Sequence, residues 1–161
     1  MSKTALVLIH LSSIDSYADF FSKEDPSFEG AWELSKRIVA AVSRHHGPIV
    51  IADQDWEYAG VHSRPRASLE AAIAQSGKKI TRIHFDEDET HWDPFLKKLR
   101  KTLERLDVDK VILGGVWFDP DQKDGCVTAT YEYLEQHFET KVASDLVGVE
   151  QDLEPYGPHT W

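Results

Sequence analysis

The sequence is poor in cysteine and has no long hydrophobic run. Cys126 is the single cysteine among 161 residues, so no disulfide can form within the chain, and we expect a reducing compartment. The apolar run at residues 5–11 is too short to cross a bilayer, and too short for the apolar region of a signal peptide with its flanks. These absences predict a cytoplasmic protein with no membrane partner.

Basic residues are outnumbered by acidic ones. The chain has 28 acidic side chains against 18 lysines and arginines, which gives a formal net charge of -10. Most of such a surface would repel a phosphate backbone, so nucleic acid is not an expected partner. A small anionic substrate is still compatible with this charge, because a local pocket can oppose the overall sign. Gly114-Gly115 belongs to neither a GxGxxG nor a Walker pattern, and no GxSxG is present, so nothing indicates nucleotide binding.

The chain alternates short apolar runs with amphipathic stretches, and its length suits one domain over residues 1–161 with a C-terminal tail at 152–161. Continuous apolar runs are typical of strands buried on both faces, whereas apolar residues at helical spacing indicate helices that cover a sheet. The expected strands are Ala5–Ile9, Ile49–Ala52, Lys79–Phe85, Val111–Val116 and Lys141–Val147, and the expected helices are Ala31–His45, Ala67–Gln75, Pro94–Leu106 and Gly125–Phe138.

This alternation predicts an α/β fold: a three-layer α/β/α sandwich around a mainly parallel, Rossmann-like sheet of five or six strands. Ligands of such sheets bind beyond the carboxyl ends of the strands, near the point where the strand order reverses. The long loops expected at Ser12–Gly30, at Asp53–Pro65 and after Val116 all leave that edge. We therefore expect the working site there.

Cys126 is the residue best placed for chemistry, because it follows the fourth predicted strand and begins the last predicted helix. A helix N-terminus offers backbone N–H groups and a partial positive charge, and both favour the thiolate form of cysteine. The thiolate could act as a nucleophile, and the N–H groups could hold an oxyanion during acyl transfer. The alternative is a small buried residue that packs the helix against the sheet.

Four segments carry a family resemblance through their shared order along the chain. They are Thr4–His10, the loop Asp53-Gln54-Asp55-Trp56 with His62 and Ser63 after it, Gly115-Val116 followed by Cys126-Val127-x-x-Thr130, and Val142–Asp145. In this order they resemble the opening strand, the metal loop, the nucleophile segment and the strand-plus-aspartate of the isochorismatase-like cysteine hydrolases, which include the nicotinamidases.

The resemblance implies a hydrolase that attacks a C–N or ester bond of a small molecule through Cys126. It also implies that backbone N–H groups around Trp117 and Cys126 stabilise the oxyanion, and that the chain assembles into homo-oligomers. The chain departs from the family at four places. One is the extra stretch Trp117–Gly125 between Val116 and Cys126. His10 stands where the family has its catalytic aspartate, no clear counterpart of the family lysine occurs in residues 84–92, and Glu57 replaces a metal-binding histidine.

These departures leave two functions open. His10 could act as general base or form an ion pair with the Cys126 thiolate, since the ordinary histidine pKa near 6.5 suits that work. The alternative is a strand-end histidine that only hydrogen-bonds a loop. In that case the chain would be a catalytically degenerate member of the same fold that serves as a binding or assembly module.

The second loop could bind a divalent metal (zinc, iron or manganese), because it contains carboxylates and an imidazole. The candidate ligands are Asp55, Glu57 and His62, with Asp53 as a further carboxylate, although acidic loops are more often only solvated. Four aromatic residues follow strand ends and could line a pocket for a flat ligand or seal a subunit contact. They are Trp56, Trp92, Trp117 and Phe118.

Overall fold

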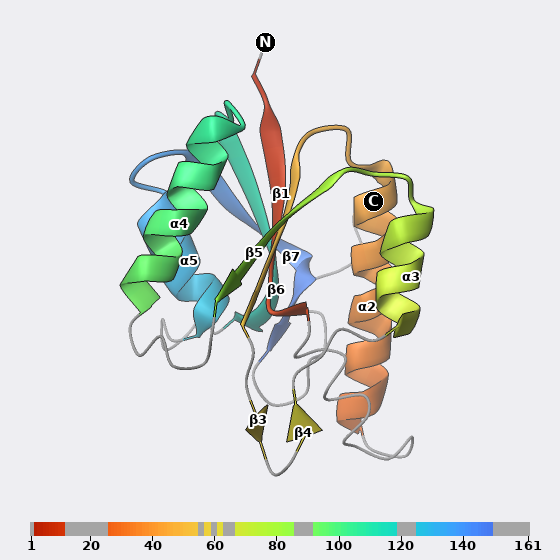
Figure 1. The fold of residues 1–161 in the computed structure, drawn as a ribbon. Helices are drawn as coiled ribbons and strands as arrows, with labels where there is room; N and C mark the ends of the chain where they lie inside the picture. Colours follow the sequence, from red (N-terminus) through yellow and green to blue (C-terminus); the bar gives the residue numbers. More distant parts are fainter. Residues whose placement is uncertain are drawn as a thin grey trace.

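The computed structural model describes residues 2–11, 26–54, 57–58, 61–62, 67–85, 92–118 and 125–149. The expected tail at 152–161 lies outside these residues. Eleven helices and strands are assigned within them, and the main sheet runs through the middle of the molecule with helices on both faces (Figure 1). Within the described residues, no helix has the length and apolar character needed to cross a membrane.

The main sheet has five strands, all parallel, in the order β5-β2-β1-β6-β7. Its strands are β1 (Thr4–Ile9), β2 (Ile49–Gln54), β5 (Ile80–Phe85), β6 (Lys110–Phe118) and β7 (Glu139–Val149). This confirms the predicted α/β class and parallel sheet. The chain builds outward from β1 to β5 and then returns to the other side of β1 with β6, so the strand order reverses between β1 and β6.

Alternate residues of the central strands serve the two faces of the sheet. Leu6 and Leu8 belong to a buried cluster with α2 (Pro26–Arg44) and α3 (Ala67–Gln75). Ala5, Val7 and Ile9 belong to the opposite cluster, with α4 (Trp92–Arg105) and α5 (Cys126–Leu134). Because both faces are apolar, the strands read as continuous apolar runs in the sequence.

The extents of two predicted loops are wrong, and the last predicted helix ends at Leu134 rather than at Phe138. Helix α2 starts at Pro26, inside the expected loop Ser12–Gly30, and proline suits a first helical turn because its missing N–H would have no intrahelical partner there. The expected loop Asp53–Pro65 contains the end of β2 and a small antiparallel pair, β3 (Glu57–Tyr58) and β4 (Val61–His62). Such two-residue strands are too short to leave an alternating pattern in the sequence.

Strand β7 is irregular where it passes β6. Leu113 pairs with Val142 and Gly115 pairs with Val147, so two steps along β6 correspond to five along β7. The extra residues form a bulge beside Gly114. Ala143 and Leu146 both pack on the α2/α3 side of the sheet, although a regular strand would place residues three apart on opposite faces.

Candidate active site

His10 directly follows β1 at the point where the strand order reverses. It is 3% exposed, its backbone N–H donates to the Ala52 carbonyl oxygen at 2.9 Å, and its φ angle is 55°. Histidine is among the residues that tolerate this left-handed conformation more often than most. The chain therefore turns away from the sheet at His10 while its imidazole stays buried.

Burial determines the protonation state of His10. Desolvation lowers the pKa of His10 from 6.5 to about 4, because the imidazolium ion loses its hydration. The imidazole is consequently neutral at pH 7. It can accept a hydrogen bond or a proton, but it does not supply a positive charge beside a thiolate at that pH.

Gly115 brings β6 against β1 immediately before His10. Its φ angle is 108°, and a Cβ atom built there would collide with the backbone oxygen of Ile9 and lie 2.6 Å from the Ile9 nitrogen. Only glycine combines this φ with this contact. The two strands on either side of the switch point are therefore fixed in close contact at their carboxyl ends.

Cys126 is the first residue of α5, as the sequence predicts. Gly125 caps the helix with a φ angle of 100° and accepts the Ala129 N–H at 3.0 Å. The Cys126 side chain is half-buried and packs against the α4/α5 core cluster, and its carbonyl accepts the Thr130 hydroxyl at 2.6 Å. The first-turn N–H groups have no partner within the helix and are available to an anion.

Two buried carboxylates lie near the same edge. Asp53 is 8% exposed and pairs in register with His84 of β5, one residue beyond the Ile9–Ala52 pair. Asp145 is 2% exposed within the bulge of β7, and no hydrogen bond reaches its Oδ2 atom from the residues that the structure describes. Sequence reasoning did not count Asp145 among the site residues. The signal was an acidic residue among the small and apolar residues 142–149 of the strand.

The chain is similar in structure to an isochorismatase-like hydrolase. That protein comes from Alkaliphilus metalliredigens, and the superposition covers 94% of this chain and 85% of the other, with a TM-score of 0.49 and 16% sequence identity. No family model and no curated protein matches the sequence.

The structure describes only part of the predicted metal loop. Asp55 lies outside the described residues, and Glu57 and His62 are register partners in the β3–β4 pair, with backbone alone described. Across residues 2–11, 26–54, 67–85, 92–118 and 125–149 no three histidine, cysteine, aspartate or glutamate side chains gather into a metal site. The metal site at the loop stays a prediction.

The structure also describes only some of the four predicted aromatic residues. Trp56 lies outside the described residues. Trp92 is the first residue of α4, and Trp117 is the penultimate residue of β6, so Trp117 does not follow the strand end as expected. Phe118 is half-buried and packs against the α4/α5 core cluster. The core therefore covers part of the Phe118 side chain, and that part is not available to a ligand.

Proposed function

We propose that the chain is a divergent cysteine hydrolase that cleaves a C–N or ester bond of a small molecule through the Cys126 thiolate. The placement of Cys126 carries the proposal: it begins α5 after the carboxyl end of β6, next to the reversal of strand order. That is where ligands bind in open α/β sheets. A cysteine at a helix N-terminus gains thiolate character there.

The reaction balances without a cofactor. The Cys126 sulfur forms a bond to the carbonyl carbon, and the C–N or C–O bond then breaks. The proton lost by the thiol passes to the leaving amine or alcohol. Water hydrolyses the thioester, which releases a carboxylic acid and restores the thiol. First-turn N–H groups of α5, and that of Trp117, would stabilise the oxyanion of both tetrahedral intermediates.

His10 would serve as a neutral proton acceptor rather than as a permanent ion-pair partner. With a pKa of about 4 it is a weak base in the empty site, so the helix N-terminus would carry most of the thiolate stabilisation. A substrate that brings a hydrogen-bond acceptor to the imidazole would raise its basicity.

The second function is a catalytically degenerate binding or assembly module. Two observations favour it: the low pKa of His10 makes proton transfer inefficient, and Phe118 packs into the core next to the predicted pocket. In this case Cys126 would be a packing residue, and its thiol would show no activation.

The deciding experiment is the alkylation rate of Cys126 by iodoacetamide between pH 5 and 10, followed by intact mass. Each added mass reports the same thiol because the chain has one cysteine. A midpoint well below the ordinary value of ~8.5 supports the hydrolase. An ordinary or raised midpoint would reject it and leave the binding module.

The alkylation experiment has a direct enzymatic follow-up. A panel of small amides and esters would be incubated with the wild type and with Cys126→Ser, with release of amine or acid as the readout. We expect turnover by the wild type to fall at least about 10³-fold in the variant, because the serine hydroxyl is a far weaker nucleophile at neutral pH. Equal rates in the two proteins would show that a measured turnover does not use this thiol.

A further inference from the structure

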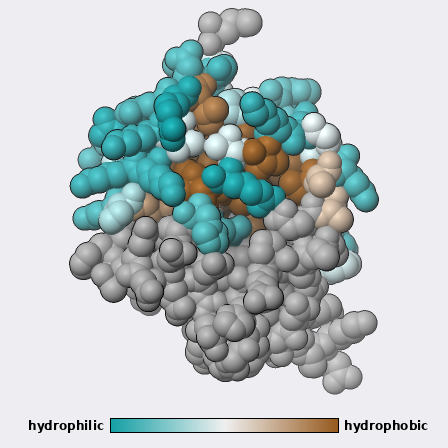
Figure 2. All heavy atoms as spheres, viewed as in Figure 1, coloured by the Kyte–Doolittle hydropathy of each residue, from teal (hydrophilic) through white to brown (hydrophobic). Residues whose placement is uncertain are grey.

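The outer face of α4 has an unusual charge pattern. Lys97, Lys101 and Arg105 lie four residues apart in one row, Lys98 lies beside them, and all four side chains are exposed. One row of a helix advances about 6 Å per four residues, so the three cations form a line about 12 Å long. Hydrophilic side chains cover the left flank of the molecule, which α4 forms in this view (Figure 2).

Neighbouring residues of this row carry like charges. Like charges four residues apart destabilise a helix, by roughly 0.2–0.5 kcal/mol for each pair. Among residues 92–118 and the other described segments, no carboxylate forms an ion pair with Lys97, Lys101 or Arg105. Arg105 instead donates to the Lys101 carbonyl at 3.4 Å and to the Thr102 hydroxyl at 3.3 Å.

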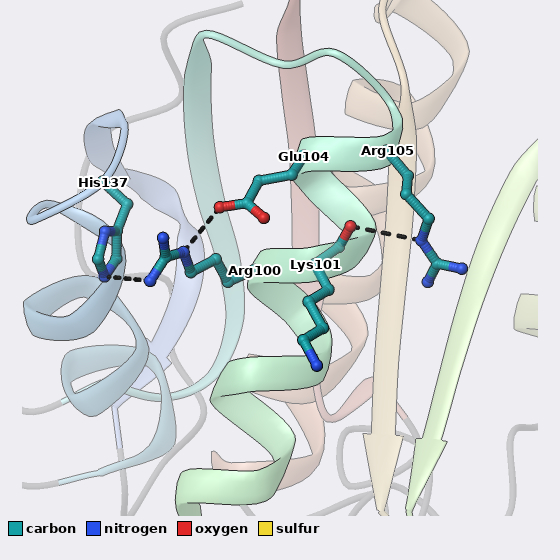
Figure 3. Close-up of polar contacts among 5 residues, drawn as sticks. All are labelled: Arg100, Lys101, Glu104, Arg105 and His137. Atoms are coloured by element: carbon teal, nitrogen blue, oxygen red, sulfur yellow. Dashed lines mark hydrogen bonds and ion pairs between the residues drawn. The ribbon is translucent and has the colours of Figure 1, made fainter.

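On the neighbouring flank of α4 the positive charge is paired with a carboxylate. Arg100 donates to Glu104 at 2.8 Å and contacts the His137 ring at 3.3 Å. Figure 3 shows Arg100 and Arg105 leaving α4 on opposite sides, with the carboxylate on the Arg100 side. The sequence thus pairs Arg100 with Glu104 on one flank of α4. On the other flank Asp93 stands four residues before Lys97, and the three cations that follow in this row have no further carboxylate among them. Arg105 lies in the last turn, where a cation complements the helix dipole.

The charge of α4 also opposes that of the whole chain. It has five basic residues against Asp93 and Glu104, a net +3, so the remaining residues sum to -13 of the total of -10. Within α4, Asp93 lies about 12 Å and 18 Å along the helix axis from Lys101 and Arg105. Both distances exceed the Debye length of about 8 Å at physiological salt.

We propose that the row formed by Lys97, Lys101 and Arg105, with Lys98 beside it, docks an acidic segment of a partner protein. Alternate side chains of an extended segment recur about every 6.8 Å, close to the 6 Å repeat of the row. An extended segment needs about five residues, roughly 14 Å, to cover the row, so most of a short carboxylate segment meets positive charge. A nucleic acid or an anionic membrane extends beyond it and meets the surrounding negative charge. Three of the four cations are lysines, which lack the bidentate fork that arginine offers to phosphate.

The test measures binding of a fluorescent octaglutamate peptide to the full chain by anisotropy, with octaglutamine as the neutral probe. We compare wild type, Lys97→Glu/Lys101→Glu, and the control Lys36→Glu/Lys141→Glu. Lys36 and Lys141 are exposed lysines on α2 and β7, so both double variants change the net charge by the same four units. The Lys101→Glu change places a carboxylate four residues before Arg105, so we expect the α4 variant to keep its fold and melting temperature.

We expect octaglutamate to bind the wild type and to weaken at least about tenfold in the α4 variant, with little change in the control. Equal weakening in both variants would reduce the effect to net charge and overturn the proposal, as would the absence of binding at 50 mM salt. Tighter binding of a single-stranded RNA decamer or of phosphatidylserine vesicles through the same lysines would assign the face to phosphate ligands instead. Loss of self-association in the α4 variant would assign it to a second copy of the chain.

Discussion

Gly115 and Ile9 are in such close contact that the backbone of Ile9 occupies the position of a side chain at residue 115. The contact lies at the reversal of strand order, one residue before His10. It therefore sets the separation of the two strands whose ends carry His10 and, beyond the following segment, Cys126. The predictions below begin with this contact.

Gly115→Ala should lower the free energy of unfolding by more than about 2 kcal/mol, because it combines a positive φ with a backbone collision. Gly77→Ala is the matched control, since Gly77 has a φ of 69° but nothing within 4 Å of the added methyl group. We expect that variant to cost about 1 kcal/mol. Urea unfolding of the two variants measures the difference, and equal losses would disprove the steric contribution.

Stability should fall as the pH drops from about 6.5 to about 4. In this window the unfolded chain protonates His10 while the folded chain keeps it neutral, so protons favour unfolding. The full effect of a shift from 6.5 to about 4 is about 3 kcal/mol. His10→Asn, which tolerates the same φ, should remove this part of the pH dependence. Urea unfolding at pH 7 and pH 5 tests it, and parallel pH profiles for the two proteins would contradict it.

Thr130→Val should destabilise the protein by about 1 kcal/mol, because the fully buried hydroxyl donates to the Cys126 carbonyl and valine has nearly the same shape. Amide hydrogen exchange should increase in the first turn of α5 before it increases elsewhere. The matched control is Thr140→Val, whose half-buried hydroxyl donates to the Phe138 carbonyl outside α5. Faster exchange at α5 in the control would show that the effect is not local.

Leu99→Ala should lower the free energy of unfolding by about 2–5 kcal/mol, since Leu99 is fully buried between α4 and the sheet. Lys97→Ala, two residues earlier on the exposed face, should change it by less than about 0.5 kcal/mol. Thermal and urea denaturation distinguish the two. A small loss for Leu99→Ala would mean that α4 contributes little to the cooperative core.

The sequence predicts most of the secondary structure because the strands are buried on both faces. Runs such as Ala5–Ile9 serve two cores at once, and helix α3 falls at the predicted residues 67–75. Strand order was beyond reach, because nothing local in β2 or β6 specifies which side of β1 each will occupy. The start of α2 at Pro26 was missed because the preceding and following residues are polar and aromatic without a clear period.

The site was predictable where chemistry follows from chain position. Cys126 after a strand and before a helix could be located from the pattern alone. The protonation of His10 could not, because its low pKa arises from desolvation by residues distant in sequence. Burial of Asp145 depends in the same way on the bulge of β7, and the bulge leaves no periodic trace in the sequence.

The bulge of β7 shifts the alternation of side chains between the two faces of the sheet. Val142 and Val147 face the same core although they are five positions apart, an odd number. A count by twos that starts in the first half therefore assigns every residue of the second half to the wrong side of the sheet. A one-residue deletion in a regular part of a strand would move every later side chain to the opposite face of the sheet. The same deletion within 143–146 would shorten the bulge and could leave the pairing on either side of it in place. Four residues there stand opposite Gly114 alone. Natural variation in strand length is therefore expected to concentrate at this stretch, next to the buried carboxylate of Asp145.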